Sequence, residues 1–568
     1  MVPTPGPHSM PVVPSQIRRR ALLSTVRPFL HRLIASVTPR TRQLRLLAIA
    51  GTAAGCLIVV AGSRVGLARS ATPFTSWLGL LARTPVNPRH SALPGLLLAL
   101  GVCAFVAVWL FTLRAMRDRG HALGQWWVVS CWWAAPFLLG PPLLSSDVFS
   151  YAAQGMLVAH GHDPYSSGPS ALGWGPTLAA VDPSWRSEPS PYGPLATVVE
   201  HLSVVLGGGT ALGAVIVLRL FAAGSVIAIG VLAMHLAGTE RAAAALGLTI
   251  LNPLLLMHVI GGVHFEGLMC ALLLATIYTA NRGQLYLALM LGCAAGAIKA
   301  PALVVVLAIV FLTLMTAQAG RGHELRNVLW RCAGVVAACW LVFTLLVPHG
   351  WGWLRSLGTP ALTSTPAAVS TLLSGLMSLV VPPPSAADAA YACRVTALFA
   401  AVVITGYLLV TAHHRPLAKT TGLALLALSL LSPVFYPWYA VWGLICLAPV
   451  VAGRPRDWLV ALSALAVTVN LPGLTTPRAA VFDTLVAIAV AVPMLRLTRA
   501  DLRGTRHRVE VAVARTIPLP GGAARHGHLV NVSRQPAVSQ RNDDWIASTP
   551  TPVAKIMNST TDANTTKL

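Results

Sequence analysis

The sequence predicts an all-α polytopic membrane protein with about fourteen transmembrane helices. Of its 568 residues, 55% are hydrophobic and only 10% are charged, whereas soluble globular proteins carry about 25% charged residues. The mean hydropathy of +0.69 indicates the same class. Apolar runs such as 92–113 and 211–236 are long enough to cross a hydrocarbon core of about 30 Å. Together these features assign the chain to the membrane class before any motif is considered.

Fourteen segments have the length and composition expected of membrane spans. They are residues 44–62, 91–113, 124–144, 211–236, 242–260, 266–280, 284–298, 301–318, 328–347, 390–411, 419–432, 436–452, 457–472 and 478–497. Two other apolar stretches, 194–207 and 366–381, are too short or too rich in Gly and Ser, so we expect interfacial or re-entrant helices there. Arg219 lies within a span and should face the bundle interior or a polar cavity.

The net charge of +24 follows a membrane pattern rather than a nucleic-acid pattern. Arg and Lys gather in the tails and short loops, as at 18–20 and 114–119, which is the distribution expected on the cytoplasmic side of a membrane protein. We therefore predict a multi-pass protein of the plasma (inner) membrane with both termini cytoplasmic. Residues 63–90, which carry four arginines in a predicted outer loop, are the main exception.

The chain is predicted to hold one transmembrane domain, residues 41–500, between two basic tails. Residues 1–40 and 501–568 are polar and rich in Pro, Ser or Thr without sustained periodicity, which is typical of disorder. We identify no removable signal peptide. The nine cysteines lie in or beside the spans and form no CxxC pair, so we expect buried thiols rather than disulfides or metal ligands.

The longest segment between spans, 145–210, is predicted to be external and ordered. It holds five acidic residues against one arginine and is rich in Pro, Gly, Tyr and Trp; long ordered loops of this kind are usually functional. Asp147 lies near the start of this segment, directly after the third span. Because an ionisable carboxylate beside the bilayer costs free energy, we predict that Asp147 has a functional role. Asp147 also suits the N-cap of a short helix over 148–160, and the two roles are compatible.

Turns and a break between spans carry further polar residues. Asp163, Tyr165 and Tyr192 lie in Gly/Pro turns, where the residue types by themselves favour a structural role. The break at 261–267, which has Gly at both ends, carries His264 and Glu266. Ionisable residues between membrane helices are costly, so we expect both to have a function. Because two ligands are too few for a metal site, we expect contacts to a substrate instead.

A lysine and an aromatic cluster complete the set of motifs. Lys299 is one of only four lysines and lies at a predicted outer helix end, where it either snorkels to the interface or offers a charge to a phosphate. Tyr436, Trp438 and Tyr439 lie at another outer helix junction and suit an aromatic belt, a sugar face or a polyprenyl chain. All these motifs fall on the same predicted side of the membrane, which chance would not produce.

Five of these segments resemble a known family. They are SSDVFSYAAQG at 145–155, GHDPY at 161–165, SPYGPL at 190–195, LNPLLL…GGVHFEG at 251–267 and SPVFYPWY at 432–439. They are similar to the actinobacterial polyprenol-phosphate-mannose-dependent α-(1→6)-mannosyltransferases, GT-C membrane glycosyltransferases of lipomannan and lipoarabinomannan synthesis. The resemblance covers roughly residues 90–497.

The resemblance implies a GT-C-type bundle with interfacial helices in the loop 145–210, and an enzyme that needs no metal or other cofactor. Mannose would pass with inversion from polyprenyl monophosphomannose to an α-(1→6)-mannan acceptor, such as mannosylated phosphatidylinositol or lipomannan. Asp147 would be the catalytic base. The remaining residues would bind the substrates. Lys299 and His264 would bind the phosphate, and Glu266 and Asp163 would bind the sugar hydroxyls. The wall of the cavity would be formed by Tyr165, Tyr192, Tyr436, Trp438 and Tyr439.

Three alternatives stay open. A GT-C enzyme specific for arabinose or glucose would differ only in pocket geometry. A secondary transporter or lipid flippase predicts broken spans at corresponding positions of two halves, and the sequence has no such correspondence. A scaffold without catalysis is disfavoured by the clustered acids of 145–210.

Overall fold

The computed structural model describes the main helical part of the chain. The described residues are 38–65, 76–77, 81–82, 92–118, 121–316, 322–347, 350–356, 365, 367–377, 385–468 and 471. Within them the only sheet is one antiparallel pair of two-residue strands, β1 (Ser76–Trp77) and β2 (Leu81–Ala82). The predicted span at 478–497, the tail 501–568 and nearly all of the tail 1–40 lie outside the described residues. The all-α prediction is confirmed for the described part.

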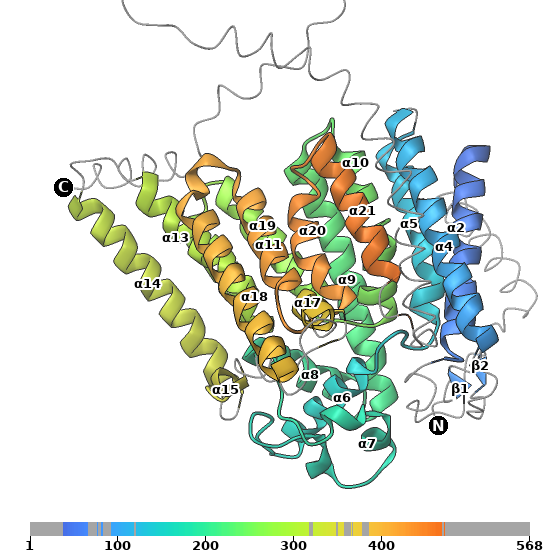
Figure 1. The fold of residues 1–568 in the computed structure, drawn as a ribbon, viewed down its shortest axis with the longest axis horizontal. Coiled ribbons are helices and arrows are strands. Elements are labelled where there is room, and N and C mark those ends of the chain that lie inside the picture. The colour runs from blue at the N-terminus through green and yellow to red at the C-terminus, as the bar shows by residue number, and fades with distance from the viewer. Residues whose placement is uncertain are drawn as a thin grey trace, which may run out of the picture.

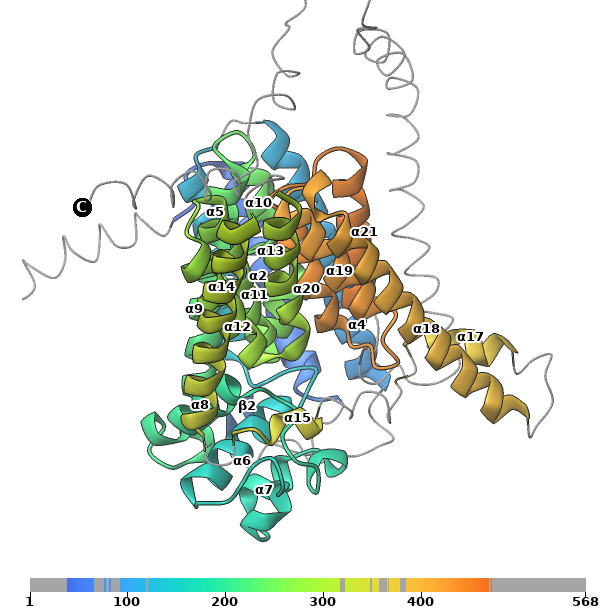
Figure 2. The same ribbon diagram turned by 90° about the vertical axis from the view of Figure 1, so that its left-hand side faces the viewer.

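Three long helices form one side of the molecule (Figures 1 and 2). They are α2 (Arg42–Gly62), α4 (Ala92–Ala115) and α5 (Leu123–Leu139). The indole of Trp133 on α5 lies directly over Gly51 of α2, where any larger side chain would collide with it, and donates a hydrogen bond to the Leu47 carbonyl at 3.0 Å. In a bilayer the hydrophobic effect does not drive helices together, because lipid tails are as apolar as the helix surfaces. Small residues at helix crossings let the helices pack closely and so stabilise their association.

The centre of the bundle contains a helix pair that is sharply bent. The elements of this centre are α9 (Ala211–Ala237), α10 (Ala242–Leu248), the π-helix η5 (Leu255–Gly261), α11 (Glu266–Asn281) and α12 (Leu285–Ile298). The η5 and α11 axes meet at 114° across a break of four residues. A π-helix is rare and is frequently found at functional sites. The break therefore buries residues 262–265, which include His264.

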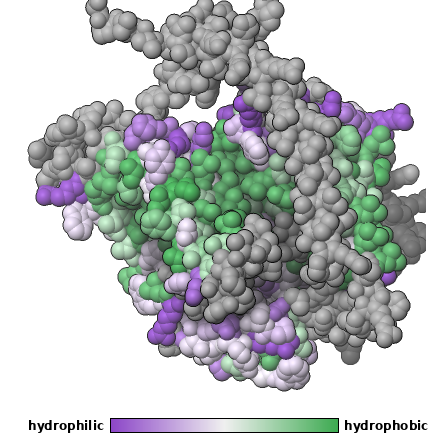
Figure 3. Space-filling model, in the orientation of Figure 1, coloured by the Kyte–Doolittle hydropathy of each residue, from purple (hydrophilic) through white to green (hydrophobic). Residues whose placement is uncertain are grey.

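The second half of the chain packs against this centre and extends outward from it (Figure 2). Its helices are α13 (Val304–Thr316), α14 (Gly322–Leu345), α15 (Trp353–Ser356), α17 (Val369–Met377), α18 (Ser385–Val410), α19 (Leu417–Leu430), α20 (Ala440–Leu447) and α21 (Arg454–Thr468). The face shown in Figure 3 is mostly hydrophobic over the bundle and hydrophilic at both ends. Apolar side chains on these helices, such as Leu345 and Phe399, remain exposed, as lipid contact requires.

A polar lobe covers one end of the bundle, built from α6 (Asp147–Ala159), α7 (Pro176–Ala180) and α8 (Pro194–Leu206) (Figure 1). Backbone of α8 approaches Gly155 of α6 so closely that a Cβ there would collide with the Glu200 carbonyl. Within residues 145–210 the structure thus has helices that pack against one another. The N-cap prediction was wrong by one residue, because Ser146 occupies the cap and Asp147 is the first helical residue.

The described helices are those of a membrane protein. Five are long and apolar enough to cross a bilayer alone, and the bent pair η5–α11 would make a sixth. They are α2, Leu93–Ala115 of α4, α9, Arg326–Leu345 of α14 and Asp388–Val410 of α18. The other predicted spans in the described part coincide with shorter helices, so the number fourteen stays a prediction. Arg219 is only 5% exposed, as expected for a cation within a span.

Candidate active site

Two loop segments meet at the junction of bundle and lobe and form the base of a polar site. The Leu143 N–H donates to the Gly261 carbonyl at 3.0 Å, which joins the segment before α6 to the break before α11. The guanidinium of Arg219 donates to the carbonyls of Leu138, Gly140 and Gly261. Arg219 therefore satisfies buried carbonyls on both segments and fixes one against the other.

Each of these segments contains a strained residue. Leu144 and Val263 have φ values of 64° and 58°, in the left-handed region that bulky and β-branched residues rarely adopt. Such a conformation costs about 1–3 kcal/mol and persists where the surrounding structure imposes it, commonly at active sites. Here the strained residues lie just before Asp147 and His264.

Asp147 and His264 face each other across the junction. Asp147 Oδ2 lies 3.5 Å from His264 Nδ1, and the aspartate side chain is 23% exposed whereas the histidine is fully buried. Ser145 Oγ accepts a hydrogen bond from the Asp147 N–H at 3.1 Å. Burial raises the pKa of Asp147 to about 6; the hydrogen bond with Ser145 and the charge of Lys299 oppose this, while Glu266 adds to it. A carboxylate that has a pKa near neutrality and that solvent can reach is suited to act as a general base.

An aromatic stack borders this pair. The His264 and Trp438 rings are stacked with centroids 4.0 Å apart, and Trp438 also stacks with Tyr436 at 4.6 Å. Trp438 comes from the short helix η8 (Pro437–Tyr439), which directly precedes α20. The stack orients the His264 ring and forms an aromatic wall beside Asp147.

Lys299 and Glu266 form a buried ion pair. Lys299 Nζ lies 2.6 Å from Glu266 Oε1, with side chains 13% and 0% exposed. The ammonium also lies over the rings of Tyr439, Trp442 and Tyr192, at 4.2, 5.2 and 5.5 Å from their centroids. Such a cage stabilises a cation. Sequence reasoning gave the two charges separate roles and missed their pairing.

The antiparallel hairpin of α11 and α12 accounts for this pair. Glu266 begins α11 and Lys299 follows the last residue of α12, and the two helices have 16 and 14 residues. Because their lengths nearly match, the start of one lies beside the end of the other. That spacing was a signal in the sequence that could have predicted the ion pair.

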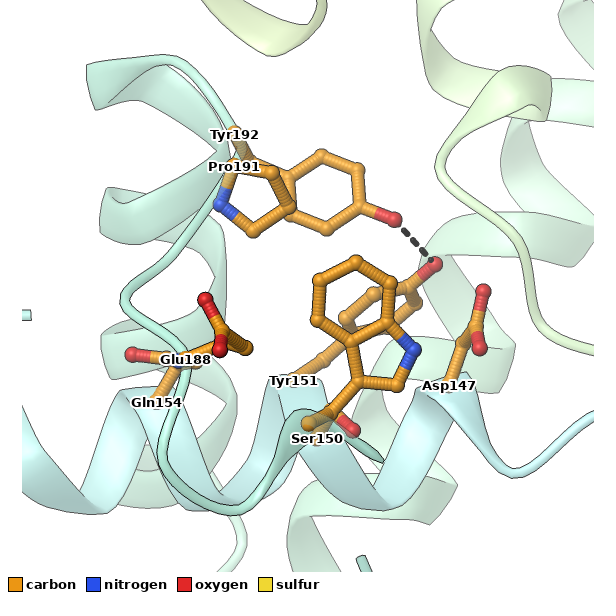
Figure 4. Close-up of a pocket in the computed structure, with 8 residues that line it drawn as sticks. Asp147, Ser150, Tyr151, Gln154, Glu188, Pro191 and Tyr192 are labelled. Atoms are coloured by element: carbon orange, nitrogen blue, oxygen red, sulfur yellow. Dashed lines mark hydrogen bonds between the residues drawn. The ribbon is translucent and has the colours of Figure 1, made fainter. Parts of the chain in front are cut away.

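Tyr151 is a further site residue that sequence reasoning missed. Its hydroxyl lies 3.1 Å from that of Tyr192 (Figure 4), and its ring packs on Phe265 with centroids 4.5 Å apart. Tyr151 is four residues after Asp147 on α6, so both side chains lie on the same face of that helix. Helical spacing from Asp147 would have identified it.

Asp163 and Tyr165 have structural partners in the lobe. Asp163 Oδ1 accepts from the Tyr165 N–H at 2.9 Å, and the Tyr165 hydroxyl bonds to Thr197 Oγ1 at 3.0 Å. The Tyr165 ring packs with Val347 and Trp353. These contacts explain both residues as parts of a turn that holds α8 and α15 together, and their contact with a sugar stays a prediction. The structure thus brings Asp147, Tyr192, His264, Glu266, Lys299, Tyr436, Trp438 and Tyr439 together, whereas these contacts place Asp163 and Tyr165 in the turn.

Fold and site together define a polytopic membrane protein with a carboxylate, a caged cation and an aromatic wall at the junction of its bundle with a polar lobe. Residues 48–317 match the model of the α-(1→6)-mannopyranosyltransferase family, N-terminal domain. Residues 365–499 match the MptB C-terminal domain. The chain belongs to the α-(1→6)-mannopyranosyltransferase family, and the resemblance found in its motifs is confirmed.

Curated relatives support the same family. The chain is 30% identical to α-(1→6)-mannopyranosyltransferase A of Mycobacterium tuberculosis over 71% of its own length and 80% of the relative's. It is 31% identical to another α-(1→6)-mannopyranosyltransferase of that organism, over 64% of this chain and 72% of the relative. Against α-(1→6)-mannopyranosyltransferase B of Corynebacterium glutamicum the identity is 30% over 56% of this chain, and the match spans 57% of that relative. No solved structure is significantly similar to the chain.

Proposed function

We propose that the protein is a GT-C-type membrane mannosyltransferase that moves mannose, with inversion, from polyprenyl monophosphomannose to an α-(1→6)-mannan acceptor. The acceptor would be a mannosylated phosphatidylinositol or lipomannan, and the product would extend lipomannan or lipoarabinomannan. The observation that carries this proposal is Asp147, a partly exposed carboxylate with a pKa of about 6 beside an aromatic wall and a caged cation.

In the proposed reaction Asp147 removes the proton from an acceptor hydroxyl. The resulting oxygen attacks the anomeric carbon of the donor mannose as the bond from that carbon to the phosphate oxygen breaks. The polyprenyl monophosphate leaves with the bonding electrons, and attack from the opposite face inverts the configuration. Lys299 offers the phosphate its ammonium charge, and preorganised charge of this kind stabilises a developing anion.

The surrounding residues have supporting roles in this proposal. Tyr192, Tyr436, Trp438 and Tyr439 would form the aromatic wall beside the substrates, and His264, whose Nδ1 lies 3.5 Å from Asp147 Oδ2, would position that carboxylate and the donor phosphate. In the described part of the chain no three His, Cys, Asp or Glu side chains converge as metal ligands do. That the reaction uses no metal ion is proposed only because the family resemblance implies it.

The proposed topology has fourteen spans and places the lobe 145–210 and the site outside the cytoplasm, in the plasma membrane. Both termini, within the tails 1–40 and 501–568, would be cytoplasmic. The support is the charge of the loops: Arg114 and Arg117 lie in the last turn of α4 and in the 3-10 helix after it, whereas residues 145–210 carry five acidic residues against one arginine.

Transfer of radiolabelled mannose by membranes containing the protein tests the function. We expect wild-type membranes to move label from polyprenyl monophosphomannose to an α-(1→6)-mannooligosaccharide, and polyprenyl phosphoarabinose and phosphoglucose to serve poorly. Efficient transfer from either of those donors, with none from the mannose donor, would make the protein a GT-C enzyme of other specificity. Movement of labelled lipid across proteoliposomes without transfer would instead make it a carrier.

The pH dependence of the reaction should report the ionisation of Asp147. Because a base must be deprotonated to act, and because burial raises the Asp147 pKa to about 6, kcat/KM should be constant above about pH 7. Below pH 6 it should fall about tenfold per pH unit. The donor is a phosphodiester and does not titrate in this range. A profile that stays flat down to pH 4.5 would contradict the assignment.

A further inference from the structure

A groove runs along α6 from Asp147 into the lobe. It is lined by Asp147, Ser150, Tyr151, Gln154, Trp185, Glu188, Pro191 and Tyr192. Figure 4 shows the first four on one face of α6, with Glu188 and Pro191 opposite them on the loop that leads to α8. From Asp147 to Gln154 the helix rises about 10 Å, so the groove extends well beyond the proposed base.

Two polar atoms in the groove have no hydrogen-bond partner among the residues that the structure describes. The Gln154 carbonyl oxygen Oε1 and the Ser150 hydroxyl are buried without a hydrogen bond, and the Gln154 side chain is only 4% exposed. Buried polar groups are nearly always paired, since an unpaired one loses its hydration without compensation. Both belong to the face of α6 that lines the groove. A ligand with hydroxyl groups would supply the missing partners.

The charge of the groove selects the kind of ligand. Among the described residues, its lining carries two carboxylates, Asp147 and Glu188, and no Lys, Arg or His. Such a surface disfavours the donor phosphate, whose charge suits the Lys299 side of Asp147, and its polar atoms disfavour a polyprenyl chain. Carboxylate, amide and hydroxyl groups beside an indole fit a sugar instead, because they bond its hydroxyls while the ring of Trp185 packs on its apolar C–H face.

We infer that this groove binds the acceptor glycan, with the reacting sugar at Asp147 and preceding sugars toward Gln154, Trp185 and Glu188. The inference rests on the proposed function, since it names the part of the same site that receives the acceptor. The groove lies in the polar lobe (Figures 1 and 4), where the glycan part of a lipid-anchored acceptor would have access. In this proposal the bundle side of Asp147 is left for the lipid-linked donor.

Two variants of the groove and two matched controls test the inference. Trp185→Ala removes the indole, and Trp174→Ala is its control, because Trp174 lies in the same loop, is 79% exposed and is not part of the groove. Glu188→Gln removes an exposed carboxylate with little risk to folding, and Glu240→Gln is its control. Each full-length variant is purified in lipid nanodiscs. The measurements are the acceptor KM, the donor KM, and equilibrium binding of α-(1→6)-mannotriose without donor.

We expect Trp185→Ala and Glu188→Gln each to raise the acceptor KM and the mannotriose Kd about tenfold, and to leave the donor KM within twofold. Both controls should match wild type. Unchanged acceptor KM and Kd in both groove variants, with normal mannosyl transfer, would overturn the inference and leave the proposed function intact; a rise in the donor KM alone would do the same.

A wild-type protein that binds mannotriose but transfers no mannose would contradict the proposed function. The groove would still be supported in that case if Trp185→Ala and Glu188→Gln weaken mannotriose binding. A wild type that neither binds mannotriose nor transfers mannose would contradict both.

Discussion

Replacing Asp147 with Asn is expected to lower kcat for mannosyl transfer by about 100- to 10,000-fold, the usual contribution of a general base. Asn has the same shape but cannot accept the proton of the acceptor hydroxyl. The donor KM should change little, because the Asp147 carboxylate is not proposed to contact the phosphate. Initial rates with radiolabelled polyprenyl monophosphomannose and saturating acceptor measure the effect.

The variant should fold at least as well as wild type. Burial disfavours the ionised Asp147 carboxylate, as its raised pKa shows, so a neutral amide removes an unfavourable interaction. Asp182→Asn is a matched control in the same loop, since Asn keeps the oxygen that accepts from the Ser184 N–H. Asp147→Asn with a kcat within threefold of wild type, at equal expression, would show that another group is the base.

The second large effect is expected from Lys299→Met. This change leaves the fully buried Glu266 carboxylate without its cation, and removing one partner of a buried ion pair typically costs about 3–5 kcal/mol. We expect a lower unfolding temperature in detergent, measured by intrinsic fluorescence, and almost no transfer activity. Lys419→Met is the control, because Lys419 is exposed and lies in the first turn of α19.

The double variant Glu266→Gln with Lys299→Met separates stability from function. Replacing both charges removes the unpaired carboxylate, so much of the lost stability should return. Donor binding should not return, because the ammonium proposed to contact the phosphate is still missing. If the double variant binds donor as tightly as wild type, Lys299 serves the fold alone.

The sequence by itself determined the class of the protein and the positions of several of its helices, although the predicted span 242–260 is divided into α10 and η5. Apolar runs of sufficient length must form helices in a bilayer, since only a helix satisfies its own backbone there. The helices at 211–237 and 194–206 begin and end within one residue of the predicted boundaries, 211–236 and 194–207. The motifs around Asp147 and His264 also determined the family, because they are local in the sequence.

Only the tertiary structure decided which side chains meet. The pairing of Glu266 with Lys299, the stacking of His264 on Trp438 and the unpaired oxygen of Gln154 each depend on contacts between segments distant in the chain. Between membrane helices such contacts depend on shape and polar complementarity rather than on hydrophobicity, because lipid is as apolar as the helix surfaces. Hydropathy therefore predicts that a helix lies in the membrane, but it does not predict which side of the helix faces its neighbours. The packing of the whole bundle decides that side, and with it the partners of Asp147.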